Sequence, residues 1–314
     1  SLFAETQPKQ IAIDFFDNHG FVDIEKLKAE FNSLKIVEEV VNRIRPLHWD
    51  LEFADLLKKG GFDLIVGNPP WLKIEWEEKG VISDADPMVL IRKVTASELA
   101  KRRENALSKN PKLLKAYLEE FVEQTGSKNF ISSSTNYQLL KGTQNNLYKC
   151  FLPNSWRIAS NNGIQGFLHP EGIYDDPKAG LLRTVLYERL RKHFQFQNQL
   201  FLFPIKDGVK YSLNIYGPNR QPSFIHLANL FHPKTIDACF SHDGKGRVGG
   251  IKTVNKQWNL KGHRHRLINV DEKLLALFAR LYDEPGTLPS QARLPTLHSQ
   301  QYQSVLEKFS NTSN

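Results

Sequence analysis

The sequence predicts an α/β protein built on a mostly parallel sheet that ends in an antiparallel hairpin. Residues 62–67 form a short apolar run after Gly60 and Gly61, which is typical of a buried strand of a parallel sheet. Residues 163–170 form a second such run. Residues 194–203 and 209–216 are rich in β-formers and are joined through an Asp-Gly turn, as in a hairpin. A parallel sheet that ends in a hairpin is an accepted mixed arrangement.

The N-terminal part, residues 1–45, is predicted to be a helical segment that precedes the sheet. Asp23 is placed to cap a helix that continues to about residue 45, because apolar side chains recur at helical spacing and Pro46 follows. Residues 46–50 are predicted to be a strand or its edge. A short helix is predicted over residues 51–59.

A long helical insertion is predicted after the first strand, over about residues 87–145. Apolar positions recur at helical spacing over residues 87–124, and the Asn110-Pro111 step should divide this stretch into two helices. Residues 127–144 are rich in Ser, Asn and Thr and are predicted to be a long loop. Such a loop is either functional or disordered, and the sequence leaves both open.

The second strand is framed by two predicted helices. Residues 146–151 are predicted to be helical, and Asp175 or Asp176 is placed to cap a helix with Pro177 in its first turn. The insertion and these strands and helices make up a predicted domain over residues 46–231.

The C-terminal part, residues 232–314, is predicted to be a basic extension. Residues 224–231 and 235–240 are predicted strands, and a glycine-rich loop follows over residues 242–250. Residues 271–282 are predicted to be a helix, and the tail from residue 283 a linker with a short final helix.

The glycine-rich loop formally matches a dinucleotide-binding fingerprint, Gly244-x-Gly246-x-x-Gly249. That fingerprint needs a following helix whose N-terminus receives a phosphate. Residues 251–254 are β-prone instead, so we reject the fingerprint.

Composition favours an anionic partner. The chain of 314 residues has a formal net charge of +8 and a pI near 9.3, which suits nucleic acid, although the excess could also be an ordinary solvated surface. Cys150 and Cys239 lie far apart and show no metal-ligand spacing, so we expect neither a disulfide framework nor a metal site. No apolar run reaches membrane-spanning length and no signal peptide is evident, so we expect a cytoplasmic protein. Because the chain begins with Ser1, we expect a fragment of a longer parent.

The first strand is followed directly by Asn68-Pro69-Pro70-Trp71. Open α/β sheets bind ligands beyond the carboxyl ends of their strands. The two prolines fix the backbone and remove two donors, Asn68 brings an amide, and Trp71 brings a flat aromatic face. This combination suits a planar ring that carries an exocyclic amine. The alternative is an ordinary turn that closes a strand.

At this motif the sequence resembles amino-group methyltransferases that use S-adenosylmethionine, above all adenine-specific DNA methyltransferases. The resemblance is closer to the methyltransferase part of large restriction-modification or phage-defence enzymes, because it extends over roughly residues 40–230 and includes Trp49-Asp50-Leu51-Glu52-Phe53. It implies a Rossmann-like methyltransferase sheet, S-adenosylmethionine as cofactor, and methylation of the N6 amine of adenine in DNA.

The resemblance also implies roles for individual residues. Asn68 and the Pro69 carbonyl are expected to accept the two amine hydrogens, within the rigid backbone that Pro70 completes. Trp71 is expected to stack on an adenine flipped out of double-stranded DNA. Asp50 corresponds to an acidic residue near the cofactor adenosine, although it is equally suited to cap the following helix.

Basic residues around the motif and in the C-terminal part are predicted to contact phosphates, because they are interleaved with an aromatic residue. They are Lys73, Lys245, Arg247, Lys252, Arg264 and Arg266.

The chain departs from the resembled family in one respect. No Gly-x-Gly cofactor motif precedes Asn68, so the sheet is expected to be incomplete on its N-terminal side. A longer parent polypeptide would supply this motif and a target-recognition domain beginning near or after residue 290. Two other readings remain open, namely a methyltransferase that acts on RNA or protein glutamine, and a non-catalytic nucleic-acid-binding module. Trp71 and the large insertions favour DNA.

Overall fold

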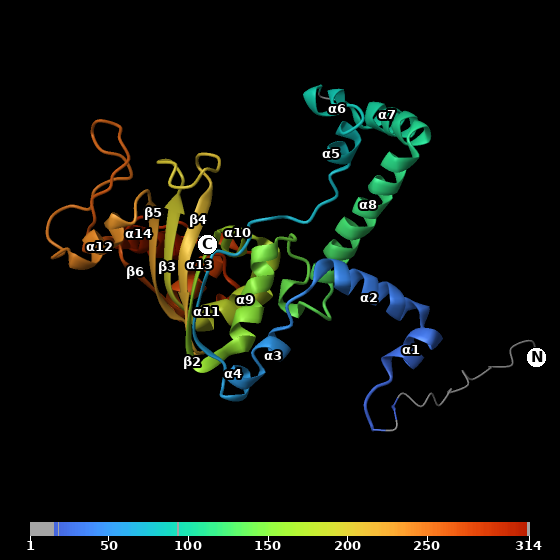
Figure 1. Ribbon diagram of the computed structural model, residues 1–314. Helices are drawn as coiled ribbons and strands as arrows, with labels where there is room; N and C mark the ends of the chain where they lie inside the picture. Colours follow the sequence, from blue (N-terminus) through green and yellow to red (C-terminus); the bar gives the residue numbers. More distant parts are fainter. Residues whose placement is uncertain (1–15, 18, 93, 313–314) are drawn as a thin grey trace, which may run out of the picture. The chain divides into compact units, whose positions relative to one another are not determined.

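The computed structural model describes residues 16–17, 19–92 and 94–312 (Figure 1). The chain divides into two compact units, residues 1–55 and residues 56–314, which are described separately. No helix within the described residues is both long enough and apolar enough to cross a lipid bilayer.

The first unit is helical in its described part. It contains α1 (Ile24–Glu30), α2 (Asn32–Ile44) and α3 (Trp49–Glu52), and α4 (Ala54–Lys58) begins at its end. Asp23 caps α1 as predicted, because its carboxylate accepts the N–H of Lys26 at 3.0 Å. The predicted helix is confirmed in two pieces, divided at Phe31, whose backbone is extended. No residue of α2 is buried.

The strand predicted over residues 46–50 is wrong. Residues 46–48 form no strand, and α3 begins at Trp49. The His48 carbonyl accepts the N–H groups of Leu51 and Glu52, which closes a single helical turn. Five residues carry too little periodicity to distinguish such a turn from a strand.

The second unit is built on a six-stranded sheet with the order β1-β2-β4-β3-β5-β6. The strands are β1 (Phe62–Gly67), β2 (Ala159–Pro170), β3 (Leu190–Gln197), β4 (Lys210–Tyr216), β5 (Ser223–Leu230) and β6 (Ile268–Asp271). β1 pairs with β2 in parallel and β3 with β5 in parallel, whereas β4 and β6 run antiparallel to their neighbours. Four of the six strands therefore share one direction, and β3 and β4 pair as the expected hairpin. The strand predicted over residues 194–203 is wrong in its second part, because residues 198–203 lie in the connecting loop, where the Asn198 side chain donates to the carbonyls of Phe203 and Ile205. The predicted fold class is confirmed.

One face of the sheet is covered by helices, namely α9 (Leu147–Ile158), α10 (Gly172–Asp175), α11 (Gly180–Arg189) and α13 (Glu272–Tyr282) (Figure 1). The main core lies here, where Phe167, Tyr216 and Phe224 of the strands pack against Leu186 and Phe278 of the helices. The predicted cap before α11 is confirmed at Asp176, and Asp271 is a further cap. The Asp176 carboxylate accepts the N–H of Lys178 at 2.9 Å before α11, and that of Asp271 accepts the N–H of Leu274 at 2.9 Å in α13.

The opposite face is covered only in part. The helix α12 (Lys234–Ser241) packs there, where Cys239 meets Phe194 and Leu230. The strand predicted over residues 235–240 is therefore wrong. Thr235 and Cys239 are one helical turn apart and both are buried, so the segment is anchored through a helical face.

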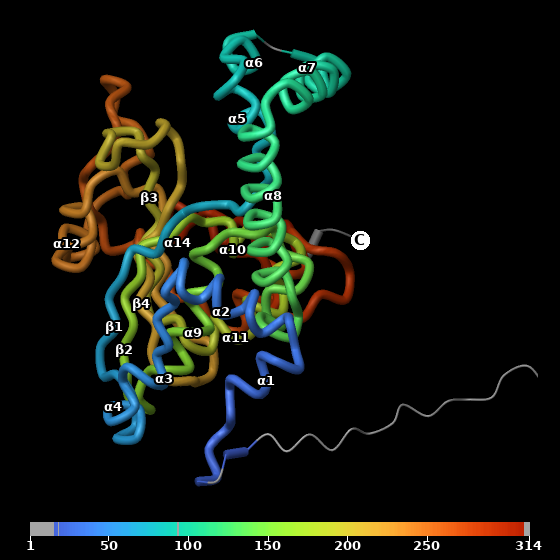
Figure 2. The backbone as a smooth tube through the Cα atoms, turned by 45° about the vertical axis from the view of Figure 1, so that its right-hand side comes forward, coloured from blue at the N-terminus to red at the C-terminus, as the bar shows by residue number. Residues whose placement is uncertain are grey.

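At the other end of this face, apolar side chains are uncovered. β1 is the edge strand beside β2 (Figure 2), and Leu64 and Val66 are 64% and 76% exposed. Exposed apolar side chains on an edge strand are unusual, because natural edge strands are normally protected by charges, prolines or bulges.

The insertion between β1 and β2 is helical, as predicted. It contains α5 (Glu78–Ser83), α6 (Met88–Ile91), α7 (Ala96–Lys109) and α8 (Pro111–Ser132), around a small core of Ile82, Val89, Val94 and Leu99. The break at Asn110-Pro111 is confirmed, since Asn110 caps α8 by accepting the N–H of Leu113 at 3.1 Å.

The loop predicted over residues 127–144 is wrong in its first part. Helix α8 continues to Ser132, and a 3-10 turn follows over Gln138–Leu140. The polar side chains near the end of α8 are exposed, and the buried Ile131 anchors that end. After α13 the chain forms the predicted final helix, α14 (Gln300–Thr312).

Candidate active site

The candidate site lies at the edge of the sheet where β1, β2 and β3 end. These strands run in one direction, so the segments that follow them meet at the same edge. The segments are residues 68–77 after β1, residues 171–179 after β2, and residues 198–209 between β3 and β4. The motif that the sequence singles out, Asn68-Pro69-Pro70-Trp71, therefore occupies the position expected of it.

The turn into β1 explains the glycines before the motif. Gly61 has φ +104°, and a Cβ at this position would lie 2.5 Å from the Ile158 carbonyl oxygen. Only glycine fits both the backbone conformation and this close approach. β1 then delivers the motif with Pro69 buried and Asn68 exposed. No described residue forms a hydrogen bond with the Asn68 side chain, so its amide is available to a ligand.

Trp71 sits in an aromatic cluster on the partly covered face of the sheet. Its indole N–H donates to the Leu168 carbonyl at 3.3 Å. Its ring centroid lies 5.6 Å from that of Tyr211 and 6.1 Å from that of Phe203. The indole is half-buried, so one part is anchored and another part stays accessible. Phe203 and Tyr211 were missed in the sequence. Tyr211 lies in β4 and Phe203 lies in the loop before it, so only the tertiary fold brings both rings to Trp71.

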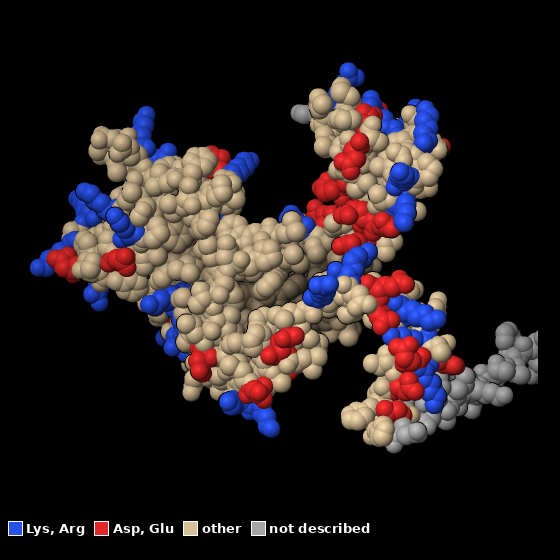
Figure 3. Space-filling model, viewed as in Figure 1, with Lys and Arg blue, Asp and Glu red and all other residues tan. Residues whose placement is uncertain are grey.

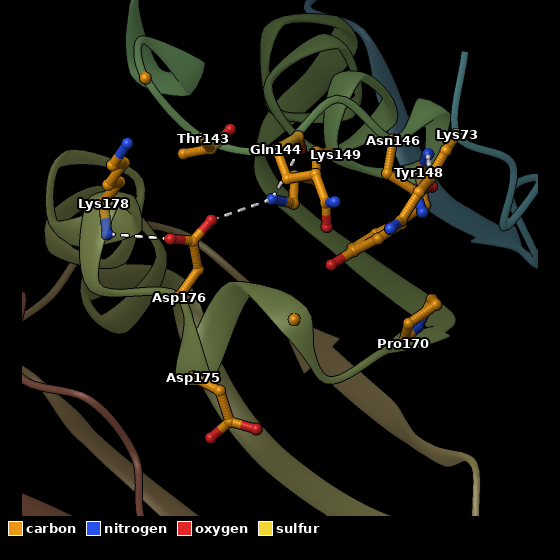
Figure 4. Close-up of a pocket in the computed structure, with 12 residues that line it drawn as sticks. Lys73, Thr143, Gln144, Asn146, Tyr148, Lys149, Pro170, Asp175, Asp176 and Lys178 are labelled. Atoms are coloured by element: carbon orange, nitrogen blue, oxygen red, sulfur yellow. Dashed lines mark hydrogen bonds and ion pairs between the residues drawn. The ribbon is translucent and has the colours of Figure 1, made fainter. Parts of the chain in front are cut away.

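A pocket of about 650 Å³ opens beside the motif (Figure 4). Three segments line it, namely the chain after Trp71, the start of α9 with the loop before it, and the turn after β2. The lining residues are Lys73, Gly142, Thr143, Gln144, Asn146, Tyr148, Lys149, Pro170, Gly172, Asp175, Asp176 and Lys178. This volume is within the usual range for small-molecule sites.

Charged groups of both signs shape this pocket. Lys149 is almost fully buried, donates to the Gln144 carbonyl at 3.0 Å, and pairs with Asp176 at 3.5 Å. Burial lowers the pKa of Lys149, although the charge of Asp176 opposes this effect. Burial raises the pKa of Asp175. Figure 4 shows Lys149 between Gln144 and Asp176, with the Tyr148 ring directed into the space between them and Pro170.

Below the pocket a buried hydrogen-bond chain crosses the sheet. Glu171 accepts from His193 at 3.1 Å and from Gln195 at 2.7 Å, and the Nδ1 atoms of His193 and His226 lie 2.8 Å apart. Burial alone would raise the pKa of Glu171, but attraction to His193 and hydrogen bonds to the carboxylate lower it to about 2. Burial lowers the pKa of His226 to about 3. These hydrogen bonds to Glu171 thus fix the start of the turn that lines the pocket.

The other predicted site residues are not all brought to this edge. Asp50 lies in the first unit, in α3, and its predicted place near a cofactor stays a prediction. Lys245, Arg247, Lys252 and Arg264 are exposed in or next to the segment after α12, where Figure 3 shows more basic than acidic side chains.

Arg266 differs from these basic residues. It is 2% exposed, and its guanidinium donates to the carbonyls of Ala228, Asn229 and Lys261. Arg266 therefore holds the segment together and does not face a phosphate. The sequence shows only a cluster of basic residues, which does not reveal that one of them turns inward.

No three His, Cys, Asp or Glu side chains of the described residues come together as a metal site. The glycine-rich loop is not followed by a helix, because residues 251–262 form turns and an isolated bridge between Lys252 and Trp258. The helix that the dinucleotide fingerprint requires therefore does not follow this loop.

Comparison with models of known protein families identifies the family of this chain. The family model of Eco57I restriction-modification methylases matches residues 10–201, which is more than half of the chain. The chain belongs to the Eco57I restriction-modification methylase family. The matched range contains the motif, the insertion, the pocket and the first three strands. The predicted resemblance is confirmed. No curated protein sequence matches this Eco57I-family chain.

Several chains of solved structures show a weak similarity to this chain. A chain from a structural study of the assembly and conformational transition of the type I R-M system is 15% identical, with a TM-score of 0.34, over 80% of this chain and 43% of that one. A chain of a DrdV–DNA complex is 13% identical, with a TM-score of 0.32, over 58% and 16%. A modification subunit of a putative type I restriction enzyme from Vibrio vulnificus YJ016 is 11% identical, with a TM-score of 0.30, over 51% and 34%. This Eco57I-family chain thus spans less than half the length of each of these three chains.

Proposed function

We propose that this chain is the acceptor-binding part of an S-adenosylmethionine-dependent methyltransferase that methylates the N6 amine of adenine in DNA, within a restriction-modification or defence system. One observation carries the proposal. Asn68 and Trp71 stand together at the carboxyl end of β1, where the Asn68 amide is exposed and the indole is half-buried. Membership of the Eco57I family supports the same class of reaction.

The chemistry follows from the acceptor. The exocyclic nitrogen of adenine is a poor nucleophile because its lone pair is delocalised into the ring. The Asn68 side-chain oxygen and the Pro69 carbonyl each accept one amine hydrogen, which makes the nitrogen more pyramidal and directs its lone pair outward. Positioning and electrostatics then supply most of the acceleration. Trp71 stacks on the base, which must leave the duplex to reach the motif.

The described residues contain the proposed binding site for the methyl acceptor but not a complete binding site for the methyl donor. β1 is the edge of the sheet, so no strand of the described chain borders the motif on its other side. No Gly-x-Gly motif precedes Asn68. S-adenosylmethionine supplies an activated methyl group when it is bound, and its site is incomplete in these residues. We propose that a longer parent polypeptide carries the remainder of that site.

DNA is the proposed partner on the grounds of charge and geometry. Lys245, Arg247, Lys252 and Arg264 are exposed and suited to phosphates. Lys73 lies in the wall of the pocket beside the motif, where it would meet the phosphate of a flipped nucleotide. These contacts position the duplex but do not identify its sequence.

The test of this function compares acceptors. A longer polypeptide that contains this chain is incubated with S-adenosylmethionine and with duplex DNA, RNA or protein, and the products are identified by mass spectrometry. We expect N6-methyladenine in DNA. Methylation of RNA or of glutamine instead would move the proposal to another substrate class, and N4-methylcytosine as the only product would contradict adenine as the target.

The incomplete donor site favours one alternative, a non-catalytic nucleic-acid-binding module. Calorimetric titration of S-adenosylmethionine into this chain and into the longer polypeptide separates the two. We expect binding only by the longer polypeptide. Binding by neither would favour the module and reduce Asn68-Pro69-Pro70-Trp71 to a structural turn.

A further inference from the structure

The loop between β3 and β4 carries an exposed apolar tip. Leu200, Phe201 and Leu202 are consecutive in the sequence, and they are 41%, 66% and 39% exposed. The loop stands at the same edge of the sheet as Asn68 and Trp71. Three successive exposed apolar side chains are costly in water, which indicates a surface that meets a partner.

The tip is held rigidly by one buried side chain at its base. Asn198 is completely buried, and its amide nitrogen donates to the carbonyls of Phe203 at 3.0 Å and Ile205 at 2.9 Å. Its side-chain oxygen accepts the N–H of Phe203 at 3.2 Å. The loop is therefore preorganised and does not collapse its apolar residues onto the sheet.

The backbone at the summit of the tip is strained. Phe201 has φ +51°, in the left-handed region that residues with a Cβ rarely adopt. Its N–H donates to the Asn198 carbonyl at 3.2 Å. Such strain persists only where the surrounding structure enforces it, and it is concentrated at functional sites. Phe201 is also the most exposed of the three apolar residues.

The residue that follows the tip, Phe203, contacts the Asn68-Pro69-Pro70-Trp71 motif. Phe203, two residues after Phe201, contacts Trp71 with ring centroids 6.1 Å apart, and its ring packs edge-on against Tyr211 at 5.2 Å. A base that reaches Trp71 leaves a gap in the duplex close to this loop. Lys206 and Lys210 are exposed beside the tip and suit the flanking phosphates, with only Asp207 of opposite charge between them.

Resting on the proposed function, we propose that the Leu200-Phe201-Leu202 tip is a wedge that enters the base stack and fills the gap left by the flipped adenine. Apolar side chains inserted between base steps are an established way to compensate for unstacking. Phe201 would stack on the neighbouring base pair, and the two leucines would cover its edges. The ligand is thus a duplex with an opened base step, recognised independently of sequence.

The test uses two duplexes of identical mixed sequence, one intact and one with a single tetrahydrofuran abasic residue, which provides the gap in advance. Affinities are measured by fluorescence anisotropy. We expect the wild-type chain to bind the gapped duplex about fivefold or more tightly than the intact one, since one aromatic stack has about that effect. Phe201→Ala and Phe201→Gly should bring the ratio close to one. Phe309→Ala, which removes a 62% exposed phenylalanine from α14, should leave it unchanged.

Several results would overturn the wedge. Equal affinities of the wild-type chain for both duplexes would do so while leaving DNA binding intact. Equal losses on both duplexes in the Phe201 variants would reduce the tip to an ordinary contact. A change in self-association without a change in the ratio would make it a protein interface. Failure to bind either duplex would overturn the wedge together with the DNA partner. A gap preference that persists in a longer polypeptide without methyl transfer would retain the wedge and overturn the proposed function.

Discussion

Replacing Phe201 by alanine and by glycine gives two variants that both lack the aromatic ring but differ in backbone freedom. At φ +51° a residue with a Cβ is strained by about 1 to 2 kcal/mol relative to the right-handed region. Glycine has no such strain, but it loses about 0.5 to 1 kcal/mol more conformational freedom than alanine on folding. We therefore expect Phe201→Gly to be more stable than Phe201→Ala by about 0.5 to 1 kcal/mol.

A matched pair at Val122 should show the opposite sign. Val122 is 67% exposed within α8, where glycine is disfavoured relative to alanine by about 1 kcal/mol. The free energies of unfolding of the four variants are measured in urea, and they are compared where the m-values of the variants agree. If Phe201→Ala were as stable as Phe201→Gly, the loop would not hold residue 201 in a strained conformation, and the argument for a preorganised tip would fail.

Three further predictions concern the site and its support. Trp71→Ala should weaken capture of a flipped base by about 1 to 3 kcal/mol, measured as affinity for a duplex whose target adenine is present but mispaired, and an unchanged affinity would remove Trp71 from the site. The folded-state pKa of Glu171 is lowered to about 2, so the stability that its carboxylate contributes should be complete above about pH 5 and be lost as the pH falls towards 2. In urea unfolding, the excess stability of the wild type over Glu171→Gln should therefore shrink from pH 7 to pH 3. Arg266→Ala should reduce the free energy of unfolding by about 3 kcal/mol, because three carbonyls lose their donor. Arg264→Ala should leave stability unchanged and lower the salt dependence of DNA binding. The reverse pattern would contradict the burial of Arg266.

The parts of the fold that the sequence predicts are those with a strong local signal. The apolar run before Asn68, the Asp207-Gly208 turn and the caps at Asp23 and Asp176 each depend on neighbours in the chain. The short segments over residues 46–50 and 235–240 fail because so few residues fit a helix and a strand equally well. In the second of them, tertiary burial of Thr235 and Cys239 decides in favour of a helix.

The site is predictable only at its motif. Trp71 is identifiable from its neighbours, but its partners Phe203 and Tyr211 lie in a loop and a strand more than a hundred residues later, and only the tertiary fold brings them to the indole. The contact between Glu171 and His193 likewise depends on the pairing of strands. Arg266 shows the converse, because a basic cluster in the sequence does not reveal which side chain faces inward.

The most direct test of the account is the yield of N6-methyladenine from DNA incubated with S-adenosylmethionine and a longer polypeptide that contains either the wild-type chain or Asn68→Ala. Loss of one preorganised hydrogen-bonding group at a reacting centre typically lowers the rate by about 100-fold to 1,000-fold. We predict a loss of that size for Asn68→Ala with an unchanged unfolding midpoint, and no loss for Asn162→Ala, which removes an exposed amide from β2. Equal rates for Asn68→Ala and the wild type would contradict the assignment of the motif as the acceptor site.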